Sequence, residues 1–203
     1  SATVDAHWGP KPTSTPLACY TALKQGLEKG VVPEPSTVGR LLQSFARMGD
    51  EPKVRELYAL AHEIVATSMP RQRQLASWVY VEDYMLIATC HLGHLEQAGM
   101  HRARIIEQGM APSADAYATM ISSTKDTTDD ASVARELWEE SQKFNVKPHL
   151  YLYNTIISKL SKARKAEAAL DFFKNMKAEG LQPSSVTYGA VIVCRNAAFF
   201  GSR

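Results

Sequence analysis

A short proline signal recurs along the chain and constrains its fold more than any other feature. "KGVVP", "QGMAP", "FNVKP" and "EGLQP" end at Pro33, Pro112, Pro148 and Pro183, and each has Gly or Asn three residues before the proline. Gly or Asn can end a helix in the left-handed conformation, and proline prevents the helix from resuming. Pro148 lies 36 residues after Pro112 and 35 residues before Pro183, so the signal predicts a repeated unit.

Two apolar stripes with helical spacing run through residues 150–184. The first consists of Tyr153, Ile156, Ile157 and Leu160, and the second of Ala169, Leu170, Phe173 and Met176. The segment between them is long enough only for a tight turn, which predicts an antiparallel helical hairpin. Hairpins of this size bury their apolar faces by stacking on their neighbours, so we expect an all-α solenoid.

The proline intervals predict how the chain divides into units. Pro33 and Pro112 are 79 residues apart, which allows two units and some extra residues, and Pro70 with its polar neighbours marks the break. The predicted divisions are a partial repeat at 1–34, a degenerate repeat at 35–69 and a spacer at 70–78. Three repeats follow at 79–113, 114–149 and 150–184, and a truncated repeat ends the chain at 185–203.

The last of these units has a first helix and no second. Its apolar residues are predicted to be exposed unless more chain or another protein covers them, and they include Val191, Ile192, Phe199 and Phe200. The sequence also starts without Met and without a recognisable targeting segment, so we expect a processed form or a piece of a longer protein.

Composition argues against several classes of protein. The apolar runs are too short to span a bilayer, and Cys19, Cys90 and Cys194 are too few and too scattered for a disulfide framework, which favours a reducing compartment. "CHLGH" at residues 90–94, followed by His101, lacks paired CxxC spacing, so we expect no metal there. We also expect no cofactor and no enzyme, because no phosphate loop or catalytic motif is recognisable.

The best-preserved unit resembles the pentatricopeptide repeat. It has an apolar start, Tyr-Asn-Thr at 153–155, an apolar pair, Lys162 before the turn, Phe173-x-x-Met176 and Gly180-x-x-Pro183. The Trp and Gly-Tyr of a tetratricopeptide first helix are missing. Residues 152–192 also resemble fungal mitochondrial members that activate translation of an organelle mRNA, such as that for cytochrome oxidase subunit 1.

The resemblance implies a right-handed superhelix that binds single-stranded RNA, one nucleotide per repeat. In the family, the fifth and last residues of a unit read the base edge, which here are Asn154 and Ser184 and which by resemblance favour cytosine over uracil. The second residues of successive units enclose the base, and here these are Tyr151 and Val186. The alternative for Asn154 is a residue that satisfies a backbone N–H at the start of the helix.

Basic residues near the turn of this unit are candidates for phosphate binding. Lys162 matches the phosphate-contacting position of the family, and Lys159, Arg164 and Lys165 lie close by. The unit carries six basic and three acidic residues, which favours salt-dependent binding. The alternative is an ordinary solvated helix face.

Other units depart from the family pattern. The reading pair of 114–149 is Ala118 with His149, and the fifth residue of 35–69 is Gly39. Neither Ala nor Gly has a polar side chain. The 114–149 unit also carries seven acidic and four basic residues, including "DTTDD" at 126–130.

Two hypotheses follow for the function of the chain. The first is RNA binding in organellar gene expression, in the mitochondrial matrix, to stabilise an mRNA or to activate its translation. The second is a protein-interaction scaffold, for example one docked on the mitochondrial ribosome or on an assembly complex through the apolar surface at Phe199 and Phe200.

Overall fold

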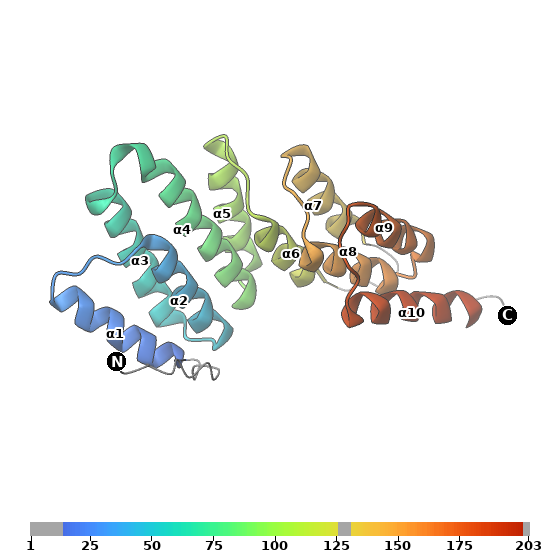
Figure 1. The fold of residues 1–203 in the computed structure, drawn as a ribbon, viewed down its shortest axis with the longest axis horizontal. Coiled ribbons are helices and arrows are strands. Elements are labelled where there is room, and N and C mark those ends of the chain that lie inside the picture. Colours follow the sequence, from blue (N-terminus) through green and yellow to red (C-terminus); the bar gives the residue numbers. More distant parts are fainter. Residues whose placement is uncertain (1–13, 126–130, 201–203) are drawn as a thin grey trace, which may run out of the picture.

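The computed structural model describes residues 14–125 and 131–200, with side chains through Cys194. Within these residues the chain forms ten α-helices and no strand (Figure 1). The helices are α1 (Pro16–Glu28), α2 (Pro35–Arg47), α3 (Glu51–Ser68), α4 (Arg71–His91), α5 (Leu95–Glu107), α6 (Ala114–Ser123), α7 (Ser132–Lys143), α8 (Leu150–Lys162), α9 (Ala166–Ala178) and α10 (Ser185–Phe200).

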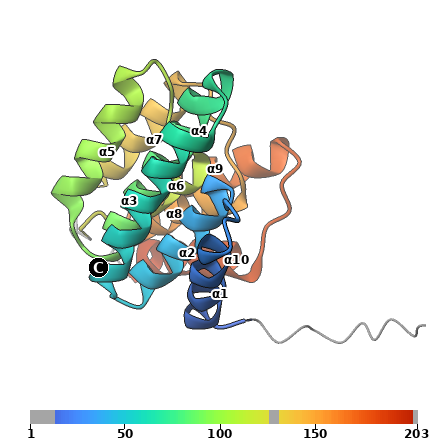
Figure 2. The same cartoon turned by 90° about the vertical axis from the view of Figure 1, so that its left-hand side faces the viewer.

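The helices are arranged as stacked hairpins, which confirms the predicted all-α solenoid. The first helices α2, α4, α6, α8 and α10 form a row in which each packs on the next. The second helices α3, α5, α7 and α9 each pack on the first helix of their own hairpin. The molecule is elongated, with α1 and α10 at opposite ends of Figure 1. Figure 2 looks along the row from the end that holds α1, α2 and α3. The hand of the superhelix stays a prediction.

The turn between successive hairpins has the backbone geometry that the proline signal predicts. Gly30, Gly109, Asn145 and Gly180 all have positive φ, between 57° and 82°. After α9, the N–H of Leu181 bonds to the carbonyl of Met176 at 3.1 Å, which closes the helix end in a Schellman-type turn. The repeated turn thus sets the direction of each new first helix.

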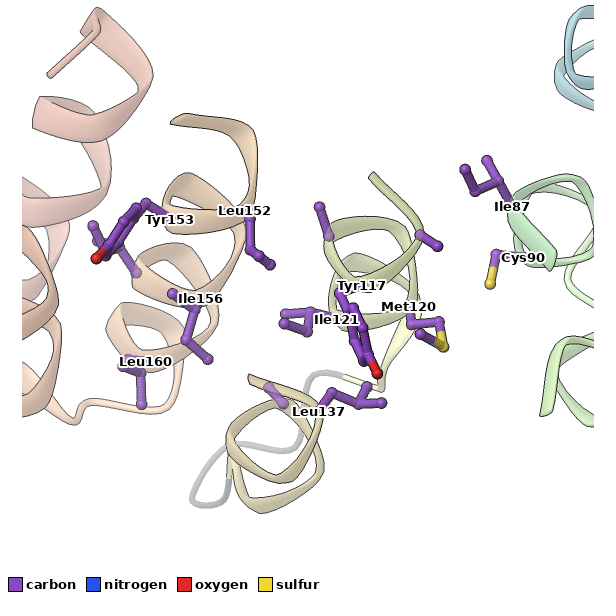
Figure 3. Packing of buried hydrophobic residues seen from close by; sticks show 14 of the residues in the cluster. Ile87, Cys90, Tyr117, Met120, Ile121, Leu137, Leu152, Tyr153, Ile156 and Leu160 are labelled. Atoms are coloured by element: carbon purple, nitrogen blue, oxygen red, sulfur yellow. The ribbon is translucent and has the colours of Figure 1, made fainter. Parts of the chain in front are cut away.

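The buried hydrophobic residues form two clusters along the row of first helices. Helix α4 joins them, because its Val81 and Met85 pack with α2 and α3 while its Leu86 and Ile87 pack with the helices that follow. Figure 3 shows the second cluster, in which Leu137 packs with residues of α6 and α8. The four residues of the first predicted stripe of α8 are buried, with exposures of 1% or less.

One residue of the predicted α9 stripe was placed wrongly. Leu170 is 40% exposed, whereas Ala169 and Met176 are fully buried. Phe172 packs toward the core instead, with its ring 4.8 Å from that of Trp138 in an edge-to-face arrangement. Leu170 directly follows Ala169, so it points about 100° around the helix and away from the core.

Residues 71–78, which we expected to form a spacer, are the first two turns of α4. Pro70 interrupts the backbone only briefly, since α3 ends at Ser68 and α4 begins at Arg71. The extra residues of this part of the chain lengthen α3 and α4 to 18 and 21 residues, compared with 13 in α8. The segment begins with two Arg and two Gln, followed by Leu75 and Ala76, all of which favour helix, so the proline ends one helix without preventing the next.

The last helix leaves part of its apolar surface uncovered. Ile192 and Val193 are 57% and 56% exposed, while Val191 is half-buried. The side chains of Phe199 and Phe200 lie outside the described ones. Among the described helices, none combines the length and the apolar character that crossing a membrane requires.

Candidate nucleic-acid interface

An open groove of about 560 Å³ lies along α8, next to the end of α6 and the start of α10. It contains five of the seven residues that we predicted to bind RNA. The groove is lined by Ser122, Leu150, Tyr151, Asn154, Thr155, Ser158, Lys159, Lys162 and Val186.

Helix α8 has two faces with different roles. Its buried stripe at Tyr153, Ile156 and Leu160 packs in the core (Figure 3). The groove residues of α8, which include Tyr151 and Asn154, also recur every three or four residues. They lie on the opposite side of the helix from the buried stripe. The core packing of one stripe therefore fixes the orientation of the other.

Tyr151 and Val186 stand at the second position of successive first helices. Tyr151 is 46% exposed and Val186 is 63% exposed, and both line the groove. The Tyr151 ring lies 6.1 Å from the ring of His149 at the start of the same helix. An aromatic face and an aliphatic side chain on neighbouring helices are suited to contact the faces of an unpaired base.

The predicted reading pair forms a direct contact. Asn154 Nδ2 donates to Ser184 Oγ at 3.4 Å, and both residues are half-buried. Ser184 is also the N-cap of α10, because its carbonyl accepts the N–H of Tyr188 at 3.1 Å. Ser184 is not among the residues that line the groove, and it is connected to the groove by its hydrogen bond with Asn154.

Sequence analysis missed Thr187, which forms hydrogen bonds with both residues of this pair. Thr187 Oγ1 donates to Asn154 Oδ1 at 2.6 Å and accepts the backbone N–H of Ser184 at 3.0 Å. Its side chain is fully buried. The S-x-x-T spacing of Ser184 and Thr187 resembles a capping box, which is the sequence signal that indicates a structural role for Thr187.

The predicted basic strip divides into residues with different environments. Lys159 lines the groove but is only 9% exposed, and its Nζ donates to the backbone carbonyl of Thr124 at 2.7 Å, at the C-cap of α6. Lys162 is exposed and lines the groove. Lys165 and Arg164 are exposed in the turn after α8, outside the groove lining. Lys162 is therefore the exposed cation of the groove itself.

The fifth residues of two other units are not accessible to a base. Ala118 is fully buried. The ring of Tyr84 from α4 lies so close to Gly39 that a β-carbon on Gly39 would collide with it. The packing of one first helix on the next thus takes up both positions.

His149, the last residue of unit 114–149, is held by helix capping. Its Nδ1 accepts the N–H of Leu152 at 3.0 Å, so the proton of the neutral ring is on Nε2. Nε2 lies 2.6 Å from Asp115 Oδ1. The residues of "DTTDD" at 126–130 lie outside the described ones.

Sequence analysis did not consider the fifth and last positions of unit 79–113. Counting from residue 79, Asp83 is fifth and Ser113 is last. Ser113 donates to the Asp83 carboxylate twice, from N to Oδ1 at 2.8 Å and from Oγ to Oδ2 at 2.6 Å. Burial raises the pKa of the Asp83 carboxyl, against the effect of these two hydrogen bonds. The carboxylate is thus engaged within the protein.

The side chains of the "CHLGH" segment and of His101 have separate partners. His94 lies 2.9 Å from Glu51, and His101 lies 2.7 Å from Glu82. Burial raises the pKa of the Cys90 thiol to about 11, so it stays protonated at neutral pH and is a poor metal ligand. Across the described part of the chain, no group of three or more His, Cys, Asp or Glu residues is arranged so that it could hold a metal ion.

Comparison with known proteins places the same part of the chain in one family. Residues 148–195 match the PPR repeat family. The chain is also 35% identical over 94 residues to pentatricopeptide repeat-containing protein 5, mitochondrial, of Schizosaccharomyces pombe. That alignment covers 44% of this chain and 8% of the relative.

Two solved structures of the pentatricopeptide repeat protein PPR10 are also similar. The structure of PPR10 from maize gives a TM-score of 0.50 at 23% identity and covers 88% of this chain and 24% of PPR10. A structure of PPR10 in complex with an 18-nt psaJ RNA element gives 0.49 at 18% identity, with coverages of 89% and 29%. The chain thus spans less than a third of the length of each of these relatives. The helical fold and the repeated turn agree with this match, so the chain is similar to pentatricopeptide repeat proteins, and the repeat pattern itself is matched over residues 148–195.

Proposed function

We propose that this chain binds single-stranded RNA and that the groove along α8 takes an unpaired nucleotide. One observation carries the proposal. The groove brings together an exposed aromatic ring at Tyr151, an amide at Asn154 and a cation at Lys162, from three turns of one helix. These are the three chemical groups that a single nucleotide requires for its base face, its base edge and its phosphate.

The base is expected to enter between Tyr151 and Val186. Its edge then meets Asn154, which is held against Ser184. An amide both donates and accepts, so it can match the mixed donor and acceptor edge of a pyrimidine. The family resemblance favours cytosine over uracil for this pair.

Lys162 is expected to contact the phosphate of the bound nucleotide. Arg164 and Lys165 lie in the adjoining turn and extend the positive charge beyond the groove. Binding of this kind releases counterions and weakens as salt increases, by a slope of about 0.7 log units per phosphate contact for single strands.

One open reading site does not select a transcript. The fifth positions of units 35–69 and 114–149 are buried or covered, and that of unit 79–113 is engaged by Ser113. We infer that sequence selection needs further repeats, which agrees with the small share of its relatives' length that this chain spans. In the cell, we propose a role in the mitochondrial matrix, where the protein stabilises an mRNA or activates its translation, such as that for cytochrome oxidase subunit 1. The mitochondrial relative supports this location.

The experiment is a set of binding titrations with short C-rich, U-rich and A-rich single-stranded RNAs across a salt series. The wild-type chain is compared with Asn154→Ala, Lys162→Ala and the control Lys174→Ala, which changes an exposed lysine of α9 outside the groove lining. Asn154→Ala should reduce the preference among the RNAs. Lys162→Ala should weaken binding to all of them and lower the salt slope by about 0.7. If the wild-type chain binds none of these RNAs even at low salt, the proposal fails.

The second candidate function is a protein-interaction scaffold. It is favoured by the covered reading positions described above and by Ile192 and Val193, which are both more than half exposed on α10. Such a surface fits a protein partner, for example on a mitochondrial ribosome or an assembly complex. Replacement of both residues by Ser should then abolish partner binding while RNA binding is unchanged.

A further inference from the structure

Thr187 closes a ring of hydrogen bonds around the reading pair. The N–H of Ser184 donates to Thr187 Oγ1 at 3.0 Å, and Thr187 Oγ1 donates to Asn154 Oδ1 at 2.6 Å. Asn154 Nδ2 then donates to Ser184 Oγ at 3.4 Å. Each donor in this ring points to the next acceptor, so every bond supports the same orientation of the others.

The ring favours one orientation of the Asn154 amide over the flipped one. The hydroxyl hydrogen of Thr187 needs an acceptor within the protein because the side chain is buried, and the shortest contact is Asn154 Oδ1 at 2.6 Å. A flipped amide would present an NH₂ group to this hydroxyl, and its hydrogen would exchange the 2.6 Å bond to Asn154 for the longer contact with Ser184 Oγ at 3.3 Å. Thr187 is fully buried, so water cannot replace the lost bond.

The ring also limits what Asn154 can offer a base. One lone pair of Oδ1 accepts from Thr187, and one Nδ2 hydrogen donates to Ser184. One acceptor lone pair and one donor hydrogen therefore remain. Asn154 lines the groove and Thr187 does not, so Thr187 acts on a base only through Asn154.

We propose that Thr187 is a positioning residue that fixes the Asn154 amide in one orientation and thereby sets the base preference of the groove. This inference rests on the proposed RNA-binding function and extends it to the specificity of that site. Thr187 belongs to α10, so base reading by unit 150–184 depends on the first helix of the following unit. That helix supplies both a wall of the groove, Val186, and the residue that orients the reader.

The test compares Thr187→Val, Thr187→Ser and wild type in titrations with C-rich and U-rich single-stranded RNAs. Thr187→Val keeps the shape of the side chain and removes the hydroxyl with its contacts to Ser184 and Asn154, whereas Thr187→Ser keeps the hydroxyl. We expect Thr187→Val to reduce the ratio of the two affinities about fivefold, as for the loss of one hydrogen bond, while binding to the weaker RNA stays nearly unchanged. Thr187→Ser should have the same ratio of the two affinities as the wild type, because it keeps the hydroxyl.

Two controls separate positioning from a general structural effect. Thr89→Val removes another fully buried hydroxyl, in α4 outside the groove, and should leave the ratio unchanged. Asn154→Ala combined with Thr187→Val should give the same ratio as Asn154→Ala alone. If Thr187→Val is poorly folded by circular dichroism, Thr187→Ala takes its place. In the wild type, NMR should also show a slowly exchanging hydroxyl proton of Thr187 close to the Asn154 side chain. This measurement does not depend on how the variants fold.

The possible failures are distinguishable. If the wild-type chain discriminates between the RNAs and Thr187→Val discriminates equally well, the inference about Thr187 is overturned and the proposed function stands. The inference is also overturned if the double variant has a lower ratio of the two RNA affinities than Asn154→Ala alone. If the wild-type chain binds neither RNA at low salt, the proposed function fails and the inference fails with it.

Discussion

The ammonium group of Lys159 donates a hydrogen bond to the backbone carbonyl of Thr124 at 2.7 Å and so ties α8 to the end of α6. The side chain is only 9% exposed. A cation at this position satisfies a carbonyl that α6 leaves without a partner at its C-terminus and interacts favourably with the helix dipole. Lys159 therefore connects two units of the solenoid as well as lining the groove.

Lys159→Met should reduce the free energy of unfolding by about 2 kcal/mol, because a partly buried, charge-assisted hydrogen bond is lost. Urea denaturation followed by circular dichroism measures this. Lys162→Met is the matched control, since Lys162 is exposed on the same helix, and it should change stability little while it weakens RNA binding. Equal stability of the two variants would contradict a structural role for Lys159.

Glu82→Gln should destabilise the α3–α4–α5 region strongly. Glu82 is fully buried and accepts from Tyr58 at 2.5 Å, His62 at 2.9 Å and His101 at 2.7 Å. Gln presents an NH₂ group to at least one of these donors, which costs about 3 kcal/mol in free energy of unfolding. Glu96→Gln, at an exposed position of α5, is the control and should have little effect.

The same carboxylate should make stability depend on pH. Burial acts to raise the pKa of Glu82, but hydrogen bonds from His101, His62 and Tyr58 outweigh it and hold the pKa well below its ordinary value of 4.5. The unfolded chain therefore binds the proton first, and this contribution is present above pH 4.5 and is lost as the pH falls. Between about pH 5 and pH 3, wild type should lose stability more steeply than Glu82→Gln. Parallel curves for the two proteins would contradict the assignment.

Gly39→Ala should be destabilising, although alanine normally favours helix over glycine. The new β-carbon would collide with the Tyr84 ring, so the packing of α2 on α4 must shift at a cost of about 1–3 kcal/mol. Gly99→Ala is the control, because nothing lies within 4 Å of a β-carbon at that helical position, and it should stabilise the protein by up to about 1 kcal/mol. Thermal unfolding of both variants reveals the opposite signs.

Arg164→Gly should increase stability and weaken RNA binding. Arg164 has a φ of 58°, a left-handed conformation that costs a residue with a β-carbon about 1 kcal/mol and costs glycine nothing. Arg164 is exposed in the turn that follows Lys162, so the loss of its positive charge should lower affinity for all RNAs. Asn145→Gly changes a residue of similar φ, 57°, in the turn before α8, and should leave RNA binding unchanged. Equal effects of the two variants on binding would contradict a phosphate role for Arg164.

Much of the fold and part of the candidate site follow from local sequence patterns. The proline signal predicts the turns at Gly109, Asn145 and Gly180, because the conformational preferences of Gly, Asn and Pro are local. Helical spacing predicts the buried stripe of α8, and with it the opposite stripe that lines the groove. The spacer at 70–78 was wrong because a proline says where a helix is interrupted and not how soon the next one begins.

By itself, then, the sequence determined the repeated hairpin, its stacking and the side of α8 on which Tyr151, Asn154 and Lys162 lie. Only the tertiary structure decided that Thr187 holds the amide of Asn154, that Thr124 engages Lys159, and that the Tyr84 ring covers Gly39. Each of these contacts joins residues more than 30 positions apart, on first helices of neighbouring units. Periodicity specifies which face of a helix meets its neighbour, but the rotation and height at which two helices pack depend on the volumes of all the side chains between them.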